Sequence, residues 1–184
     1  MALREIITVG DPRLRKRSRP VEKVTPELRE LIRDMIETMD AANGVGLAAV
    51  QVGELARVIV IETPEDDDDP TSGKLFVVLN PEIVKTGKET EVGVEGCLSV
   101  PGYAGDVERA TEVVVRGLDR HGRPFRFRPY GYLARVFQHE IDHCNGILYT
   151  DRLVAPDRIW EVKPGEEEQA EAEDARQRAA APVG

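Results

Sequence analysis

The chain has 184 residues, of which 41% are hydrophobic, as is ordinary for a globular protein with one full core. Its formal net charge of −9 argues against stable nucleic-acid binding, which needs an excess of Lys and Arg. No apolar run approaches the roughly 20 residues of a membrane span, and Arg4 and Glu5 stand where a signal peptide would be apolar, so we expect a cytoplasmic protein that binds no membrane.

A loop rich in Pro and Arg, residues 9–24, precedes a predicted core helix, and we interpret its basic run as a solvated surface. Thr25 suits the N-cap of the helix and Pro26 its first position. Apolar residues then recur at helical spacing and form one apolar face: Leu28, Leu31, Ile32, Met35, Ile36 and Met39. Asn43 and Gly44 are a usual stop signal, and we expect no site in this helix.

Short strand patterns follow the helix. They cover residues 57–61, 75–79, 91–94 and 112–118, and a turn at 119–122 leads into an alternating partner at 123–128. Residues 63–73 are polar and acidic and contain two prolines, which predicts a surface insertion. A second helix is predicted from about Tyr132 to Cys144. Strands around two helices, without regular βαβ alternation, indicate an α+β domain.

From residue 164 the composition shifts to Glu, Ala, Arg and Gln. This segment could form an exposed helix, but it has no apolar stripe with which to pack. We therefore predict a single domain over residues 1–163 and an acidic, Ala/Glu-rich C-terminal tail over residues 164–184 that is partly ordered.

The second helix carries the run His139-Glu140-Ile141-Asp142-His143. Residues four apart lie on one helix face, so both imidazoles can bind one metal ion. Glu140 lies beside them, within reach of a water on that ion, which is the logic of the H-E-x-x-H motif. The alternative is a helix whose two histidines make only polar contacts.

A catalytic divalent site uses three protein ligands and keeps one position open. The remaining histidine, His121, lies in the predicted turn, so we expect the third ligand to be Cys, Asp or Glu. Cys97 follows a predicted strand and is the preferred candidate, with burial as a small apolar residue as its alternative. Cys144 lies about 100° round the helix from His143, which favours a packing role.

Three stretches of the chain resemble the signature motifs of the peptide deformylases. Residues 44–51 are similar to the family's GxGLAAxQ, residues 95–99 to its EGCLS, and residues 138–143 to its QHExDH. All fixed positions match, in the family order, and the likeness extends from about Asp11 to about Arg152. The resemblance implies a peptide deformylase-like α+β fold: antiparallel strands around a central metal-binding helix, with an N-terminal core helix.

The resemblance also implies a role for each matched position. The metal ligands would be Cys97, His139 and His143, and the general acid/base would be Glu140. The Gln51 amide and the Leu98 backbone N–H would form the oxyanion hole, and Gly46 would offer its backbone to the bound peptide. The implied reaction is metal-dependent hydrolysis of the N-formyl group from the formylmethionine of nascent polypeptides, with release of formate.

The family's usual cofactor is one Fe²⁺ per chain, and Zn²⁺, Ni²⁺ or Co²⁺ can replace it. A site with one thiolate suits these ions. We expect Ser99, Asp142 and an ion pair between Glu95 and Arg109 to support the ligands. The expected partners are formyl-Met nascent peptides. The tail is acidic where some members use a basic helix on the ribosome, so we expect any ribosome contact to be transient.

Two rival functions use the same residues. A metallopeptidase also uses H-E-x-x-H, but the Cys97 ligand and the residues 44–51 argue against it. A non-catalytic protein that binds formyl-peptides would have no use for Glu140 as a base.

Overall fold

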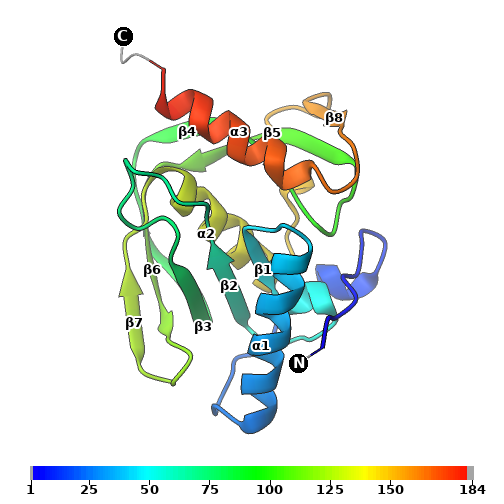
Figure 1. The fold of residues 1–184 in the computed structure, drawn as a ribbon, viewed down its shortest axis with the longest axis vertical. Helices are drawn as coiled ribbons and strands as arrows, with labels where there is room; N and C mark the ends of the chain where they lie inside the picture. Colours follow the sequence, from blue (N-terminus) through cyan, green and yellow to red (C-terminus); the bar gives the residue numbers. More distant parts are fainter. Residues whose placement is uncertain (1, 182–184) are drawn as a thin grey trace.

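The structure, a computed structural model, describes residues 2–181 and confirms the expected α+β class. In chain order the elements are η1 (Pro12–Arg15), α1 (Pro26–Ala41), β1 (Gly46–Ala48), η2 (Ala49–Val52), β2 (Val58–Glu62), β3 (Leu75–Thr86), β4 (Thr90–Gly96), β5 (Tyr103–Ala110), β6 (Val113–Leu118), β7 (Pro124–Phe127), α2 (Gly131–Cys144), η3 (Tyr149–Asp151), β8 (Ile159–Glu161) and α3 (Glu167–Ala179) (Figure 1). Within the described residues, no helix has the length and apolar character needed to cross a bilayer.

A five-stranded antiparallel sheet, in the order β1-β2-β3-β6-β7, lies between α1 and α2. The side chains of β2 alternate between the two helices. Val58 and Val60 belong to the core cluster that contains α1, whereas Ile59 and Ile61 belong to the cluster that contains α2. Because both faces of the strand are covered, it reads as a continuous apolar run instead of an alternating one.

The first helix begins where the sequence predicts. The Thr25 side chain accepts a hydrogen bond of 3.2 Å from the Leu28 N–H, and Pro26 occupies the first position. The helix ends at Ala41, shortly before Asn43, whose φ of 55° is left-handed. Its predicted apolar face is buried against the sheet, which confirms it as a core helix.

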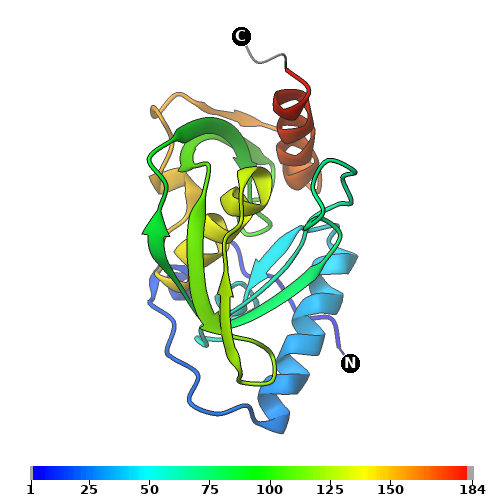
Figure 2. The same cartoon turned by 90° about the vertical axis from the view of Figure 1, so that its left-hand side faces the viewer.

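A second antiparallel sheet, in the order β4-β5-β8, covers the other side of α2 (Figures 1 and 2). The sequence pattern predicts β4 but not its partner β5. The reason is that β5 buries charged side chains, namely Asp106 and Arg109, which hide the apolar alternation on which a strand prediction depends. Each is buried with an ion-pair partner: Arg158 for Asp106, and Glu95 for Arg109.

The chain beyond residue 164 continues into α3, which packs along β4 (Figure 2). As predicted, this helix has no apolar stripe; it nevertheless has a packed face, which the sequence analysis did not foresee. The described side chains that α3 buries are Glu167 and Glu171, and both carboxylates accept hydrogen bonds from backbone N–H groups. The helix is therefore held by two carboxylates that accept hydrogen bonds from backbone N–H groups, and not by an apolar face.

Candidate metal centre

The end of β4 and the last turns of α2 bring three predicted ligands together. Cys97 is the first residue after β4, and His139 and His143 share one face of α2. The two His Nε2 atoms are 3.2 Å apart, and the Cys97 Sγ lies 3.4 Å from the Nε2 of His143. All three candidate ligand atoms lie within 4.8 Å of one another.

These separations fit one tetrahedral metal ion. Metal–nitrogen bonds of about 2.0–2.1 Å and a metal–sulfur bond of about 2.3 Å place two nitrogens about 3.3 Å apart and a sulfur about 3.6 Å from a nitrogen. The observed spacings are close to both values, and all three side chains are buried. The donor set, two imidazoles and one thiol, is one that binds Zn²⁺ and other first-row divalent ions. Cys97, His139 and His143 therefore form a site that could hold one metal ion per chain, as expected from the sequence.

His139 is oriented by a buried carboxylate. Its Nδ1 lies 2.8 Å from Glu95 Oε1, which leaves Nε2 facing His143. A ligand histidine whose other nitrogen bonds to a carboxylate has a fixed ring and a fixed tautomer. Burial lowers the pKa of His143 well below its ordinary value, and the nearby charges of His139 and Arg109 act in the same direction. His143 is therefore neutral, as metal binding requires.

Glu95 is held as an anion by Arg109, the ion-pair partner expected from the sequence. Arg109 donates to both oxygens, at 2.8 Å and 2.9 Å, which confirms the predicted ion pair. Burial alone would raise the pKa of Glu95, but the hydrogen bonds and charge of Arg109, together with those of His139, hold it below its usual range. Arg109 also donates to Asp142, at 2.7 Å, and so joins β5 to α2.

Two further arginines in this network were not singled out from the sequence. Arg135 on α2 donates to Glu95 at 2.9 Å, and its guanidinium fills the space that Gly93 leaves free on β4. Arg152 binds both oxygens of Asp142, at 2.6 Å and 2.9 Å. One signal was available for Arg135, because it lies four residues before His139 on the same face of α2, where a buried unpaired charge would be costly.

Gln51 lies beside the ligands with its amide in a defined orientation. Its Oε1 accepts the Ala48 N–H at 2.9 Å, so its Nε2 faces Ser99 Oγ at 3.1 Å and Cys97 Sγ at 3.6 Å. Leu98 follows Cys97 in the same turn, and no described residue accepts a hydrogen bond from its backbone N–H. The Gln51 amide, which donates to Ser99 and Cys97 in this structure, and the Leu98 N–H therefore both lie close to the ligand cluster.

Glu140 and Gly46 are in direct contact. A Cβ built on Gly46 would lie 2.5 Å from Glu140 Oε1 and 2.9 Å from Cγ and Cδ, so only glycine leaves room for this carboxylate. Gly46 begins β1, the outer strand of the five-stranded sheet, and pairs with Ile61 of β2 on one side only.

Cys144 and His121, which were not expected to bind the metal, lie where the sequence predicted them. Cys144 is in the hydrophobic cluster between α2 and the sheet, and burial raises the pKa of its thiol to about 12. His121 is exposed in the turn between β6 and β7, where its N–H donates to Asp119 at 2.8 Å. Neither belongs to the ligand cluster.

Comparison with known proteins gives a consistent result. A family model described as "Polypeptide deformylase" matches residues 3–158. A peptide deformylase of Thermomicrobium roseum is 47% identical over 175 residues, which cover 94% of this chain and 98% of that protein. One from Halothermothrix orenii is 49% identical over 155 residues, or 84% of this chain and 96% of that protein. The crystal structure of peptide deformylase from Ehrlichia chaffeensis covers 100% of both chains, with a TM-score of 0.78 and 35% identity.

Proposed function

This chain belongs to the peptide deformylase family and removes the N-formyl group from nascent polypeptides, and we propose how its own residues perform that reaction. Cys97, His139 and His143 hold one divalent ion, and Glu140 is the general acid/base. The observation that carries this assignment is the spacing of the three ligand atoms, with Glu140 in the same turn of α2 as both histidines.

Cys97, His139 and His143 would hold the divalent ion, which would supply Lewis acidity: it would polarise a carbonyl and lower the pKa of water toward neutral. Glu140 accepts the proton of the attacking water and then gives it to the departing amine. The Gln51 amide and the Leu98 N–H donate hydrogen bonds to the formyl oxygen as negative charge gathers there. Each well-placed donor of this kind contributes about 3 kcal/mol to the transition state.

The backbone of Gly46 binds the peptide. Its support is the position of Gly46 on an outer strand, since an extended peptide can add to the free edge of a sheet through main-chain hydrogen bonds. The same residue contacts Glu140, so a peptide bound along β1 would have its formyl group beside the base.

We assign Fe²⁺ as the working ion, with Zn²⁺, Ni²⁺ or Co²⁺ as possible substitutes. The support is chemical: one thiolate and two imidazoles form a borderline-soft set that accepts all of them. Metal analysis of protein made anaerobically from cells without added metal tests this assignment. Zinc as the main metal in fully active protein would contradict it.

We also propose that residues 1–163 are the catalytic domain and that residues 164–184 are an appendage. A second proposal is that the enzyme meets nascent chains in the cytoplasm and that any contact with the ribosome is transient. The buried hydrophobic residues of the described chain all lie between Leu14 and Tyr149, which supports the division. The tail carries a negative charge that ribosomal RNA would repel. Firm co-sedimentation with ribosomes that disappears when the tail is deleted would contradict the transient contact.

The substitution Glu140→Gln separates this function from its rivals. We expect the variant to bind metal as the wild type does and to lose formate release by a factor of about 10²–10⁴, the usual contribution of a general acid/base. The assay is formate release from a formyl-Met tripeptide, with metal content measured on the same samples. Cleavage of the peptide bonds themselves would indicate a metallopeptidase, and an unaffected variant would indicate a binding protein.

A further inference from the structure

The side chains assigned to the reaction are covered in this structure. Gln51, Cys97, His139, Glu140 and His143 are all buried, and none exposes more than 6% of its surface. A formyl group at the end of a polypeptide has to reach them. Some element over the site must therefore move before each turnover.

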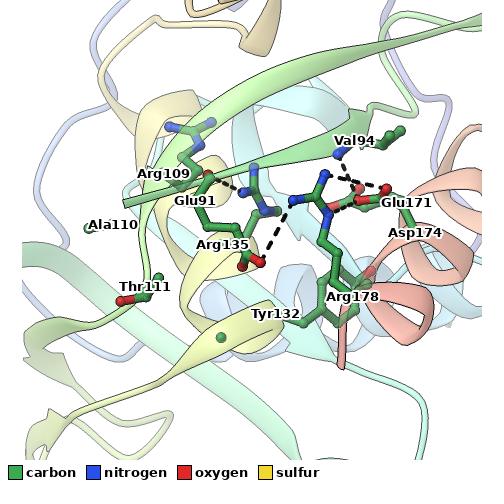
Figure 3. A pocket seen from close by; sticks show the side chains of 12 residues that line it. Glu91, Val94, Arg109, Ala110, Thr111, Tyr132, Arg135, Glu171, Asp174 and Arg178 are labelled. Atoms are coloured by element: carbon green, nitrogen blue, oxygen red, sulfur yellow. Dashed lines mark hydrogen bonds and ion pairs between the residues drawn. The ribbon is translucent and has the colours of Figure 1, made fainter. Parts of the chain in front are cut away.

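The element beside the site is α3, which runs along the free edge of β4. The Asp174 carboxylate accepts the Val94 N–H at 3.1 Å (Figure 3). The Glu171 carboxylate accepts the Gly96 N–H at 3.4 Å. At Gly96 the approach is so close that a Cβ would lie 2.6 Å from the Glu167 carbonyl oxygen. The next residue along the chain is the ligand Cys97.

These carboxylates occupy donors that an extended peptide could use. Val94 and Gly96 are two apart, and alternate residues of a strand present their N–H groups to the same edge. The other edge of β4 is paired with β5. A peptide added to the free edge would accept the same two hydrogen bonds with its carbonyls and would end beside Cys97.

The space between α3 and β4 is small; a larger cavity of about 570 Å³ lies between α3 and residues 63–72, and no β4 residue lines it. A cavity of about 40 Å³ lies between α3 and α2, and Tyr132, Arg135 and Glu171 are among its lining residues (Figure 3). Pockets that bind small molecules usually measure about 300–1,000 Å³. A peptide cannot add to β4 at Val94 and Gly96 while α3 stays in place, because the helix already occupies this edge.

The helix is held in a way that permits its release. It is rich in Glu and Ala, and its buried described side chains are charged. Arg178 pairs with Asp174 in the helix, at 2.6 Å, and with Glu91 at the start of β4, at 3.7 Å. Hydrogen bonds and ion pairs of this kind are replaced by water or by a peptide backbone more readily than a packed apolar face is.

We propose that α3 is an autoinhibitory lid, which closes the active site by placing the Glu171 and Asp174 carboxylates on a free edge of β4 to which the substrate peptide can add beside Cys97. The inference rests on the proposed function. Substrate binds the open state only, so the lid raises the apparent KM in inverse proportion to the open fraction and leaves kcat almost unchanged.

The test uses the full chain with two independent ways of releasing the helix. Glu171→Ala with Asp174→Ala removes the two acceptors, and Ala172→Pro breaks the helix between them. Glu173→Ala is the matched control, because Glu173 is exposed on the same helix and accepts no hydrogen bond from β4 among the described residues. Formate release from a formyl-Met tripeptide is measured for all forms, together with amide hydrogen exchange at Val94 and Gly96.

We expect both lid variants to raise kcat/KM by about 10-fold or more through a lower KM, since a minor open state is commonly at most about 10% populated. Exchange at Val94 and Gly96 should accelerate in both, and the control should match the wild type. Formate release with unchanged or lower kcat/KM in both lid variants would overturn the lid while leaving the proposed function intact. No formate release from any form would instead overturn the proposed function, and the lid with it.

Discussion

At the scale of single residues, Gly46 and Glu140 show how two separate motifs meet. They are far apart in the sequence, yet the Glu140 carboxylate occupies the space that a side chain at position 46 would need. The glycine therefore has a steric reason to be there beyond any hydrogen bond to substrate. The same contact gives a direct way to displace the base without changing its chemistry.

We predict that Gly46→Ala lowers kcat by about 100-fold, because a displacement of about 1 Å at a catalytic group can cost that much. The added methyl would lie 2.5 Å from Glu140 Oε1, so the carboxylate has to move. Metal content should stay at the wild-type level, since the substitution does not touch a ligand. Wild-type turnover in the variant would show that the Glu140 position is not critical.

Individual residues also mark the limit of sequence reasoning at the site. Helical spacing pointed to His139 and His143 as a ligand pair and left the third ligand open, and the resemblance of residues 95–99 to the EGCLS motif implied Cys97. Arg135 could not be paired in advance, because its partner Glu95 lies 40 residues away on another element. Long-range ion pairs leave no spacing rule in a sequence.

At the scale of elements, the ion network ties β4, β5 and α2 together. Glu95 on β4 is fully buried, and its charge is balanced by Arg109 on β5 and by Arg135 and His139 on α2. A buried charge that loses its partner is strongly destabilising, whereas an exposed pair contributes little. The network is therefore more important for assembling the site than the surface pairs of this chain.

We predict that Arg109→Ala lowers the free energy of unfolding of the metal-free protein by about 3 kcal/mol, because Glu95 and Asp142 lose a shared partner. The matched control is Arg116→Ala, which removes an exposed pair with Glu82 and should cost about 1 kcal/mol or less. Urea denaturation of both variants measures the difference. Equal costs would mean that burial gives the Glu95 network no special role.

The segment before α1 is tied to that helix by a second buried carboxylate. Asp34 accepts the Ala2 N–H at 3.1 Å and pairs with Arg4 at 2.9 Å. The Ala2 N–H, with help from Arg4, holds the pKa of Asp34 below its ordinary value although burial opposes the shift. Since the folded pKa is the lower one, Asp34 stabilises the fold above the unfolded pKa of about 3.9 and loses this effect as the pH falls through the folded value.

The prediction is that Asp34→Asn lowers the Tm near neutral pH and that its difference from the wild type shrinks as the pH is lowered below about 4. Thermal unfolding of both proteins over a pH series measures this. A difference that stays constant down to the most acidic pH would mean that the Asp34 charge does not contribute.

At the scale of the whole molecule, the sequence predicted the class of fold better than its sheet order. The Thr25 cap with the apolar spacing after it located the first core helix, and the helical pattern from about Tyr132 to Cys144 located the second, because caps and helical spacing are local signals. The partition of strands into two sheets, with β3 paired to β6 across the β4–β5 hairpin, depends on contacts distant in the chain. The contact of α3 with β4 was unpredictable for the same reason.

The measurement that tests the central claim most directly is metal content and formate release on one sample purified anaerobically with Fe²⁺. We predict about one metal ion per chain, as the Cys97, His139 and His143 cluster allows, and formate release from a formyl-Met tripeptide with its peptide bonds intact. Bound metal without formate release would contradict the assigned reaction. Formate release without any bound metal would contradict the assigned site.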